Sequence, residues 1–355
     1  MDTINQLLHK TRHVLKKNAL KNGAIVSAHQ DFQHHKCIQN KHTVSVRDAS
    51  FACLAADVLG FDDIPEKFFM WCLKKNADIS KTGRIHTLYS TEGKRLIQGY
   101  QPDQAGLLLF AIWHHYKQTP HRAEKIKPLV RKLSDALCED WKETHFSILA
   151  KDIWGEFHSF PQFEENFLYS LAACCRGLSC AHQFLHHDKY MRIAEQMKKQ
   201  LDFPEMLTRS HGKHVHDAHV DASLLFIIYP LVIYHLPNKR LMQFVNTLES
   251  TLVKNNGVQR FEHDLYDGMM LQNVHVRKGG GSWPALNFLM AIYHAKTGER
   301  KKATPYYQFV LHHAEEYLPE QLFENKHQHA AQAHILSHAL FVLATKELGY
   351  FILER

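Results

Sequence analysis

The stretch Tyr169-Ser170-Leu171-Ala172-Ala173-Cys174-Cys175 is small and apolar on every side of the helix that it would form. Phe51-Ala52-Cys53-Leu54-Ala55-Ala56, earlier in the chain, has the same character. A helix with no polar face has to be buried on all sides, whereas a surface helix keeps one polar face. These two stretches therefore predict helices in the interior of the protein, with other elements packed around them.

Other stretches have the pattern of surface helices. Residues 187–201 and 239–254 each combine one apolar stripe with a charged face. The two kinds of segment alternate, and the more apolar kind recurs roughly every 48–63 residues, as in a repeated helical hairpin. Six such hairpins close into a double-layered ring, so we predict an all-α fold, an (α/α)6 barrel. The roughly twelve helices expected from periodicity cover residues 3–19, 48–60, 64–76, 103–118, 123–141, 164–184, 187–201, 220–236, 238–255, 283–297, 301–317 and 331–350.

The composition fits one domain. The chain has 355 residues, of which 45% are hydrophobic, and this is enough to bury one large core. It contains only 16 glycines and 11 prolines, and no stretch rich in Gly and Ser or in Pro divides it. We therefore expect residues 1–355 to form a single domain.

The charge and the cysteines narrow the class of protein. The net charge of +7 is mild, and Lys and Arg are dispersed rather than gathered in a stripe with aromatic residues, so we expect no nucleic-acid binding. The seven cysteines are odd in number and form no C-x-x-C pair, unlike a disulfide framework or a zinc knuckle. The first twenty residues lack the apolar core of a signal peptide, and no stretch approaches the length of a membrane span. We expect a cytoplasmic protein that has no membrane partner.

Polar and aromatic residues gather immediately before the more apolar helices. In a barrel of hairpins the connecting loops at one end form a funnel, where these residues would meet. Aromatic rings that stack on sugar C–H faces, beside carboxylate and Arg groups that bind hydroxyls, are typical of a carbohydrate site. Helix capping would explain single residues such as Asp48 and Asp103, but not the whole series. The series comprises residues 47–48, 100–104, 152–154, 260–264 and 318–321.

Read in order, these segments resemble the motifs of family 15 glycoside hydrolases, the family of glucoamylase and glucodextranase. Asp221-Ala222-Ser223-Leu224-Leu225 matches the family's D-A-S-L-L without change. The resemblance covers nearly the whole chain and implies a barrel that acts on α-linked glucosides or on the ends of α-glucans. The other similar segments are residues 22–28 (G-x-I-x-A-S), 46–49 (W-x-R-D-A), 101–106 (Q-L-D-E-x-G), 257–266 (G-V-R-R-Y-x-x-D-x-Y, followed by Trp283-Pro284), 318–321 (L-P-E-Q) and 336–339 (W-S-H-A).

The resemblance also implies a mechanism and a set of site residues. Members of the family invert the anomeric carbon with two carboxyl groups: an acid protonates the glycosidic oxygen, and a base activates water on the opposite face. Glu320 holds the position of the base. Arg47, Asp48 and Arg260 would bind the hydroxyls of the terminal glucosyl unit. Five further motif residues would bind the substrate in the same pocket, namely Asp103, Trp154, Asp264, Tyr266 and Trp283.

The general acid is the point at which the sequence departs from the family. The family motif is D-x-W-E-E, but Asp152-Ile153-Trp154 is followed by Gly155, which puts glycine at the acid position and Glu156 beside it. A second register reads Phe163-Glu164-Glu165-Asn166 as the W-E-E-N portion after a shortened loop. The acid is therefore Glu164, Glu156 or absent.

Two aromatic platforms of the family are also missing. Ser45 replaces the tryptophan of W-x-R-D, and Leu336 replaces that of W-S-H-A, which would weaken or reshape the inner subsite. We expect an exo-acting, inverting hydrolase of α-linked glucosides. The alternative is a catalytically impaired relative that binds a glycan or regulates a partner. A carboxyl group that faces Glu320 across the pocket would distinguish the two.

Two other clusters are not expected to form sites. The histidines at 211, 214, 216 and 219 are crowded, but their spacing is irregular for metal ligands. Lys278-Gly279-Gly280-Gly281-Ser282 lacks the preceding strand and the G-K-S/T order of a phosphate-binding loop. We expect neither a metal ion nor a cofactor.

Overall fold

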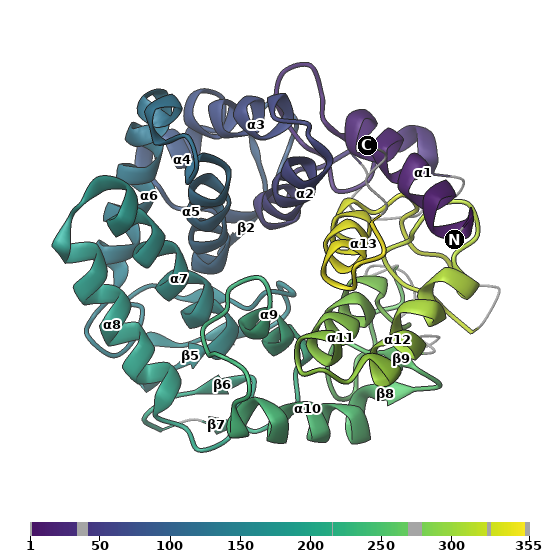
Figure 1. The fold of residues 1–355 in the computed structure, drawn as a ribbon. Coiled ribbons are helices and arrows are strands. Elements are labelled where there is room, and N and C mark those ends of the chain that lie inside the picture. The colour runs from purple at the N-terminus through teal and green to yellow at the C-terminus, as the bar shows by residue number, and fades with distance from the viewer. Residues whose placement is uncertain (1, 34–41, 215, 269–278, 325–327, 352–355) are drawn as a thin grey trace.

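Two concentric rings of helices form a toroid in the computed structural model, which describes residues 2–33, 42–214, 216–268, 279–324 and 328–351 (Figure 1). Each inner helix contacts the next one around the ring, and the last contacts the first, so the ring is closed. This architecture confirms the predicted (α/α)6 barrel. The inner helices are α2 (Val46–Leu59), α5 (Pro102–Tyr116), α7 (Leu168–Leu185), α9 (Leu225–Ile228), α11 (Pro284–Lys296) and α13 (Ile335–Glu347).

The outer helices are amphipathic and turn their apolar stripes inward. In α8 (Asp188–Asp202), Tyr190, Ile193 and Met197 are buried and the helix contacts α7. Its Asp and Lys residues occupy the other face, as expected for a helix at the surface. The remaining outer helices are α1 (Asp2–Asn18), α3 (Asp63–Lys74), α6 (Lys127–Asp140), α10 (Lys239–Leu252) and α12 (Arg300–His313), with the short α4 (Ala77–Thr82) and the 3-10 turns η1 (Gln30–Phe32), η2 (Pro120–Ile126) and η3 (Pro161–Phe163) between helices.

The inner helices α5 and α7 cross at unusually close range. A Cβ atom on Gly106 would collide with the backbone carbonyl of Ala173, and one on Gly177 would collide with the backbone of Gly106. Glycine at both positions lets the two backbones meet, so small residues in this part of the sequence serve a packing need.

The fourth inner helix is much shorter than predicted. Periodicity suggested a helix over residues 220–236, but a 3-10 turn, η4 (Ala222–Leu224), leads into α9, which ends at Ile228. Tyr229 is extended because it precedes Pro230, and a proline disfavours helical backbone at the residue before it. Residues 222–228 of this run are buried, as predicted, but Pro230 within it prevents one continuous helix.

Short strands form three small sheets in the loops, which the prediction of an almost purely helical chain did not include. In the largest sheet, β1 (His86–Tyr89) is antiparallel to β2 (Arg95–Tyr100). One pair of residues joins β2 to β3 (Ala150–Lys151), and β3 is antiparallel to β4 (His158–Ser159). Most of these strands have two residues, too few to show an alternating pattern in a sequence. The other sheets are β5 (Asn166–Phe167) with β6 (Ser210–His211) and β7 (His216–Asp217), and β8 (Val253–Lys254) with β9 (Gly257–Val258).

Most buried apolar residues belong to one connected core, which extends from Leu7 near the N-terminus to Leu348 near the C-terminus. Six of the seven cysteines are buried and unpaired, and Cys37 lies outside the described residues. No helix in the described part of the chain is long and apolar enough to cross a membrane.

Candidate active site

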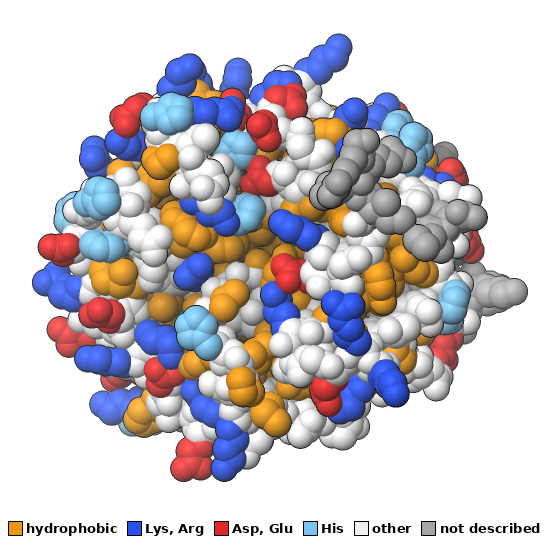
Figure 2. Space-filling model, viewed as in Figure 1, with side chains coloured by type: hydrophobic (Ala, Val, Ile, Leu, Met, Phe, Trp, Pro, Cys, Tyr) orange, Lys and Arg blue, Asp and Glu red, His pale blue; other side chains and the backbone are white. Residues whose placement is uncertain are grey.

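A cavity of about 190 Å³ opens at one face of the toroid, and loops that lead into inner helices line it. Figure 2 shows the hollow near the centre of this face, with apolar side chains at its floor and both basic and acidic ones beside it. The sequence-predicted residues that line the cavity are Arg47, Asp48, Trp154, Glu156, Arg260, Tyr266, Trp283 and Glu320.

Glu320 is buried at the wall of this cavity, with 6% of its surface exposed. The Tyr266 hydroxyl donates a hydrogen bond to its Oε2 atom over 3.3 Å. Its backbone N–H donates to the carbonyl of Ala331 over 2.8 Å, which fixes the loop that carries it. Burial raises the pKa of Glu320, and the nearby His334 and Arg260 oppose that shift only in part. The carboxyl group is thus held in a dry setting, where a proton is easily gained.

Arg260 is fixed on one side by a carboxylate that lies behind it. Its Nε and Nη2 atoms donate to the two oxygens of Asp264 over 2.8 and 2.7 Å. The guanidinium lies against the rings of Trp154 and Trp283, at 5.1 and 5.3 Å from their centroids. Asp264 does not line the cavity itself, and it therefore positions Arg260 rather than contacting a ligand.

Arg47 and Asp48, at the start of α2, are held in place by buried polar residues. The Ser27 hydroxyl donates to Asp48 Oδ2 over 2.9 Å, and Arg47 Nη1 lies 3.4 Å from Asp103 Oδ2. Asp103 is fully buried and does not reach the cavity. Burial raises the pKa of Asp103, and Arg47 opposes this shift. Ser45, found where the family has tryptophan, accepts a hydrogen bond from the N–H of Asp48 as the cap of α2.

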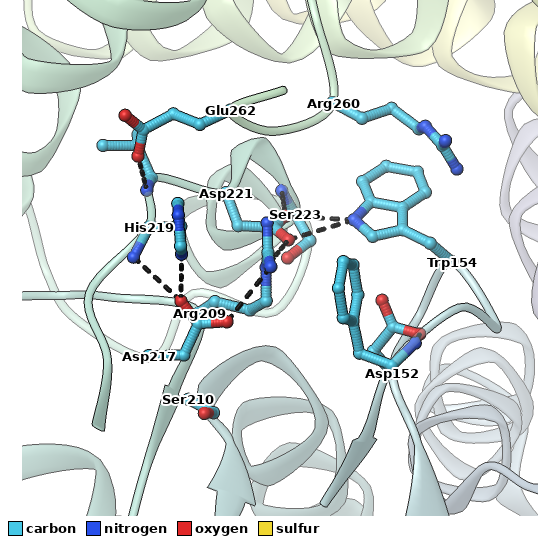
Figure 3. Close-up of polar contacts among 12 residues, drawn as sticks. Asp152, Trp154, Arg209, Ser210, Asp217, His219, Asp221, Ser223, Arg260 and Glu262 are labelled. Atoms are coloured by element: carbon cyan, nitrogen blue, oxygen red, sulfur yellow. Dashed lines mark hydrogen bonds and ion pairs between the residues drawn. The ribbon is translucent and has the colours of Figure 1, made fainter. Parts of the chain in front are cut away.

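Trp154 belongs to a polar network that Figure 3 shows in close-up. Its indole N–H donates to both carboxylate oxygens of Asp221 at 3.1 Å, and Arg209 Nε donates to Asp221 Oδ2 at the same distance. Asp221 is the first residue of the segment that matches D-A-S-L-L. The match therefore includes a residue that orients Trp154, an aromatic side chain in the cavity wall. Arg209 had no signal in the sequence motifs.

The turn after Trp154 carries Gly155, at the position of the acid in one register of the motif, and Glu156, one of the two candidates for the general acid. Asp152 Oδ1 accepts hydrogen bonds from the N–H groups of Glu156 and Phe157 over 2.8 and 3.0 Å, which shapes the turn. Burial raises the pKa of Asp152 to about 7. Gly155 and Glu156 line the cavity, and Glu156 Oε1 forms an ion pair with Arg260 Nη1 at 2.7 Å.

Glu164, by contrast, lies away from this cavity. It follows η3, where it accepts a hydrogen bond from the Thr144 hydroxyl over 2.9 Å and lies 3.5 Å from Lys213 Nζ, in a separate surface groove. The Thr144 hydrogen bond lowers the pKa of Glu164. Its neighbour Glu165 is buried and accepts a hydrogen bond from Ser210, so this register brings neither carboxyl group to Glu320.

Several lining residues were not anticipated from the sequence. His334 lies 3.9 Å from Asp48 Oδ2, immediately before α13. The helix predicted over residues 331–350 included it, so the rule that site residues precede inner helices did not point to it. Lys151 lies on β3, and Thr87, Leu88 and Ile97 come from the β1–β2 hairpin. These four had no signal, because the sheet that brings them together was not predicted.

The two clusters set aside in the sequence have structural roles. The ring of His219 contacts Asp217 at 2.6 Å, and no group of three or more His, Cys, Asp or Glu residues that could hold a metal ion occurs in the described segments. In the glycine-rich loop, Gly280 N–H donates to the carbonyl of Asp264 and Gly281 N–H to Gln321, which supports the cavity wall. Lys278 lies outside the described residues.

The toroid, with an acidic residue and aromatic and Arg side chains around its axial cavity, has the design of a glycosidase. The sequence profile of Glycosyl hydrolases family 15 matches residues 82–346. The chain belongs to this family.

The chain is similar to known proteins both in sequence and in structure. An uncharacterized glycosyl hydrolase of Methanocaldococcus jannaschii is 23% identical over 297 residues, which cover 78% of this chain and 42% of that protein. The chain therefore spans less than half the length of the curated relative that it matches.

Solved structures share the fold. A glycosidase variant in complex with glucose superposes with a TM-score of 0.81 at 16% identity, over 99% of this chain and 98% of that one. A bacterial glucoamylase complexed with acarbose gives 0.75 at 18% identity, over 96% and 55% of the two chains. The glucoamylase from Saccharomycopsis fibuligera gives 0.74 at 10% identity, over 98% and 95%.

Proposed function

We propose that the chain is an exo-acting hydrolase of α-linked glucosides, in which Glu320 is the general base. The observation that carries this proposal is the burial of Glu320 at the wall of an axial cavity, beside Tyr266 and near Arg260. In an inverting mechanism the base takes a proton from the attacking water, and a buried carboxylate with a raised pKa is a stronger base than an exposed one.

The same cavity suits one terminal glucosyl unit. Arg47, Asp48 and Arg260 offer charged groups for its hydroxyls, while Trp154 and Trp283 offer apolar surface for its ring. The proteins of similar fold that were solved with glucose or with acarbose support a carbohydrate ligand. Support also comes from the rigid fixing of Arg260 by Asp264, since a preorganised group loses little freedom on binding.

We assign Glu156 to sugar binding rather than to proton donation. Its Oε1 atom is engaged by Arg260 Nη1 at 2.7 Å, which ties Glu156 to the arginine that we expect to bind the sugar hydroxyls. Gly155 stands where the family carries its acid and has no proton to give. Hydrolysis should then depend strongly on the leaving group. The absence of a carboxyl group at Gly155 also favours a second function, in which the protein binds a glycan and hydrolyses little of it.

Kinetics on two substrates test the proposal. We expect the wild type to hydrolyse a nitrophenyl α-glucoside, whose leaving group needs little protonation, much faster than maltose. Glu320→Gln should lower that rate by roughly 100- to 10,000-fold while glucose still binds. Glu324→Gln, the same change at an exposed position of the same loop, is the matched control.

The outcomes separate the candidates. Equal rates for the wild type and Glu320→Gln would remove Glu320 from the role of base. A wild type that binds acarbose in calorimetry but hydrolyses neither substrate would establish the second function. Loss of activity in Glu164→Gln would return the acid to Glu164, in spite of its place in another groove.

A further inference from the structure

Lys151 brings a positive charge to the part of the cavity where Gly155 replaces the expected acid. It lies on β3, and its ammonium group donates a hydrogen bond to the carbonyl of Gly155 over 3.1 Å. The two arginines of the cavity are neutralised, Arg47 by Asp103 and Arg260 by its own carboxylate partners. Lys151 forms no ion pair with any residue that the structure describes, so its charge is available to a ligand.

The position of Lys151 is built into the surrounding sheet. A Cβ atom on Gly99, in β2, would approach the Lys151 Cδ atom to 2.6 Å, so glycine makes room for the lysine stem. The turn leaves space beside it, because a Cβ on Gly155 would meet only Thr87 Cγ2, at 3.4 Å. The lysine stem is therefore held beside the turn, and the glycine leaves room for a substituent of the substrate.

A glycosidic bond breaks when the negative charge that develops on the leaving oxygen is neutralised. A general acid does so with a proton, and a fixed cation can do so with its charge. A cation without an acid suits a leaving group that is already a stable anion, and a lysine ammonium group binds phosphate as a point charge. Maltose, whose leaving group is a sugar alkoxide, gains far less from this arrangement.

We propose that the substrate is an α-glucoside with an anionic leaving group, an α-glucosyl phosphate, whose phosphate is bound by Lys151 beside Gly155. The inference rests on the proposed function of Glu320. The water oxygen bonds to the anomeric carbon as the bond from that carbon to the phosphate oxygen breaks, and the bonding pair leaves with the phosphate. Glu320 takes the proton of the water, and glucose and phosphate are released.

Specificity constants for α-glucose phosphate, nitrophenyl α-glucoside and maltose test this inference. We expect the phosphate ester to exceed maltose. Lys151→Met should lower the ratio of the phosphate ester to the nitrophenyl glucoside by about 100-fold, as for loss of one charge-stabilising group. Lys151→Arg keeps the charge and should keep most of that ratio. Lys213→Met, in a separate groove, is the matched control and should leave the ratio unchanged.

Oxygen-18-labelled water identifies the bond that breaks. The proposed step leaves the label out of the released phosphate, whereas label in the phosphate would reveal cleavage at phosphorus and overturn the inference. An unchanged ratio in Lys151→Met would also overturn the inference, and so would a phosphate ester that is hydrolysed more slowly than maltose. In either case, Glu320-dependent hydrolysis of the nitrophenyl glucoside would still support the proposed function. If no substrate shows Glu320-dependent hydrolysis, the proposed function itself fails.

Discussion

Glu320 should set the pH dependence of hydrolysis. Its pKa is raised by burial, and a general base works only in its ionised form. The specificity constant for a nitrophenyl α-glucoside should therefore fall as the pH drops through the raised pKa, at a higher pH than for an ordinary glutamate. A pH–rate profile that stays flat down to the ordinary range of glutamate would contradict this assignment.

Gly155 offers a test by gain of function. Gly155→Glu would restore a carboxylic acid at the family's acid position, and we expect maltose hydrolysis to rise by roughly 100-fold, the lower range for general acid catalysis. Gly155 has a φ of +74°, so any side chain strains the backbone there, and Gly155→Ala is the control for that strain. A folded Gly155→Glu variant that gains nothing on maltose would show that the acid is not the missing group.

At the scale of single residues, the sequence predicted the chemistry of the pocket better than its geometry. The motif matches placed Arg47, Asp48, Arg260 and Glu320 together, and all four line the cavity. The choice between Glu156 and Glu164 could not be made, because both registers of the motif require a gap. A two-residue pairing of β5 with β6 and the turn at η3 decide it, and such short elements have no signature in a sequence.

Among the elements, the crossing of α5 and α7 should be the least tolerant of change. Gly106→Ala would force a Cβ atom against the backbone of Ala173, and we expect a loss of about 3 kcal/mol in the free energy of unfolding, the upper range for overpacking. Gly60→Ala, at the left-handed C-cap of α2 with open space around it, should cost only about 1 kcal/mol. Urea denaturation of both variants makes the comparison, and equal losses would contradict it.

The helices themselves were largely predictable, since each spans enough residues for its apolar pattern to appear. The exception, residues 220–236, shows the limit of periodicity. The run from Leu224 to Tyr234 is apolar throughout, yet α9 ends at Ile228, two residues before Pro230. Burial can be read from composition alone, whereas helix length depends on backbone constraints that single prolines impose.

Across the whole molecule, helices from the two ends of the chain pack against each other where the ring closes. α1 packs on α13 and α2, and Thr11 in α1 hydrogen-bonds to the buried His338 in α13 over 2.7 Å. His338 in turn accepts a hydrogen bond from the N–H of Leu318, two residues before Glu320. Cavity residues therefore come from segments as distant as Ser27 and Leu336, and their meeting depends on closure of the ring.

A ligand that bridges these segments should stabilise the whole ring. Acarbose at about a hundred times its Kd should add about 2.7 kcal/mol to the free energy of unfolding, if it binds only the folded state. The rise in Tm, measured by calorimetry, should appear in both the wild type and Glu320→Gln, since the variant keeps the shape of the pocket. Cellobiose, a β-linked sugar, is the control. An equal rise with cellobiose would contradict an α-specific pocket.

The anomeric form of the first product tests the central claim most directly. If Glu320 activates a water molecule on the face opposite the leaving group, hydrolysis inverts the anomeric carbon. Proton NMR of a nitrophenyl α-glucoside, recorded within the first turnovers and before mutarotation, should show β-glucose. The appearance of α-glucose as the first product would mean retention of configuration and would contradict the role that we assign to Glu320.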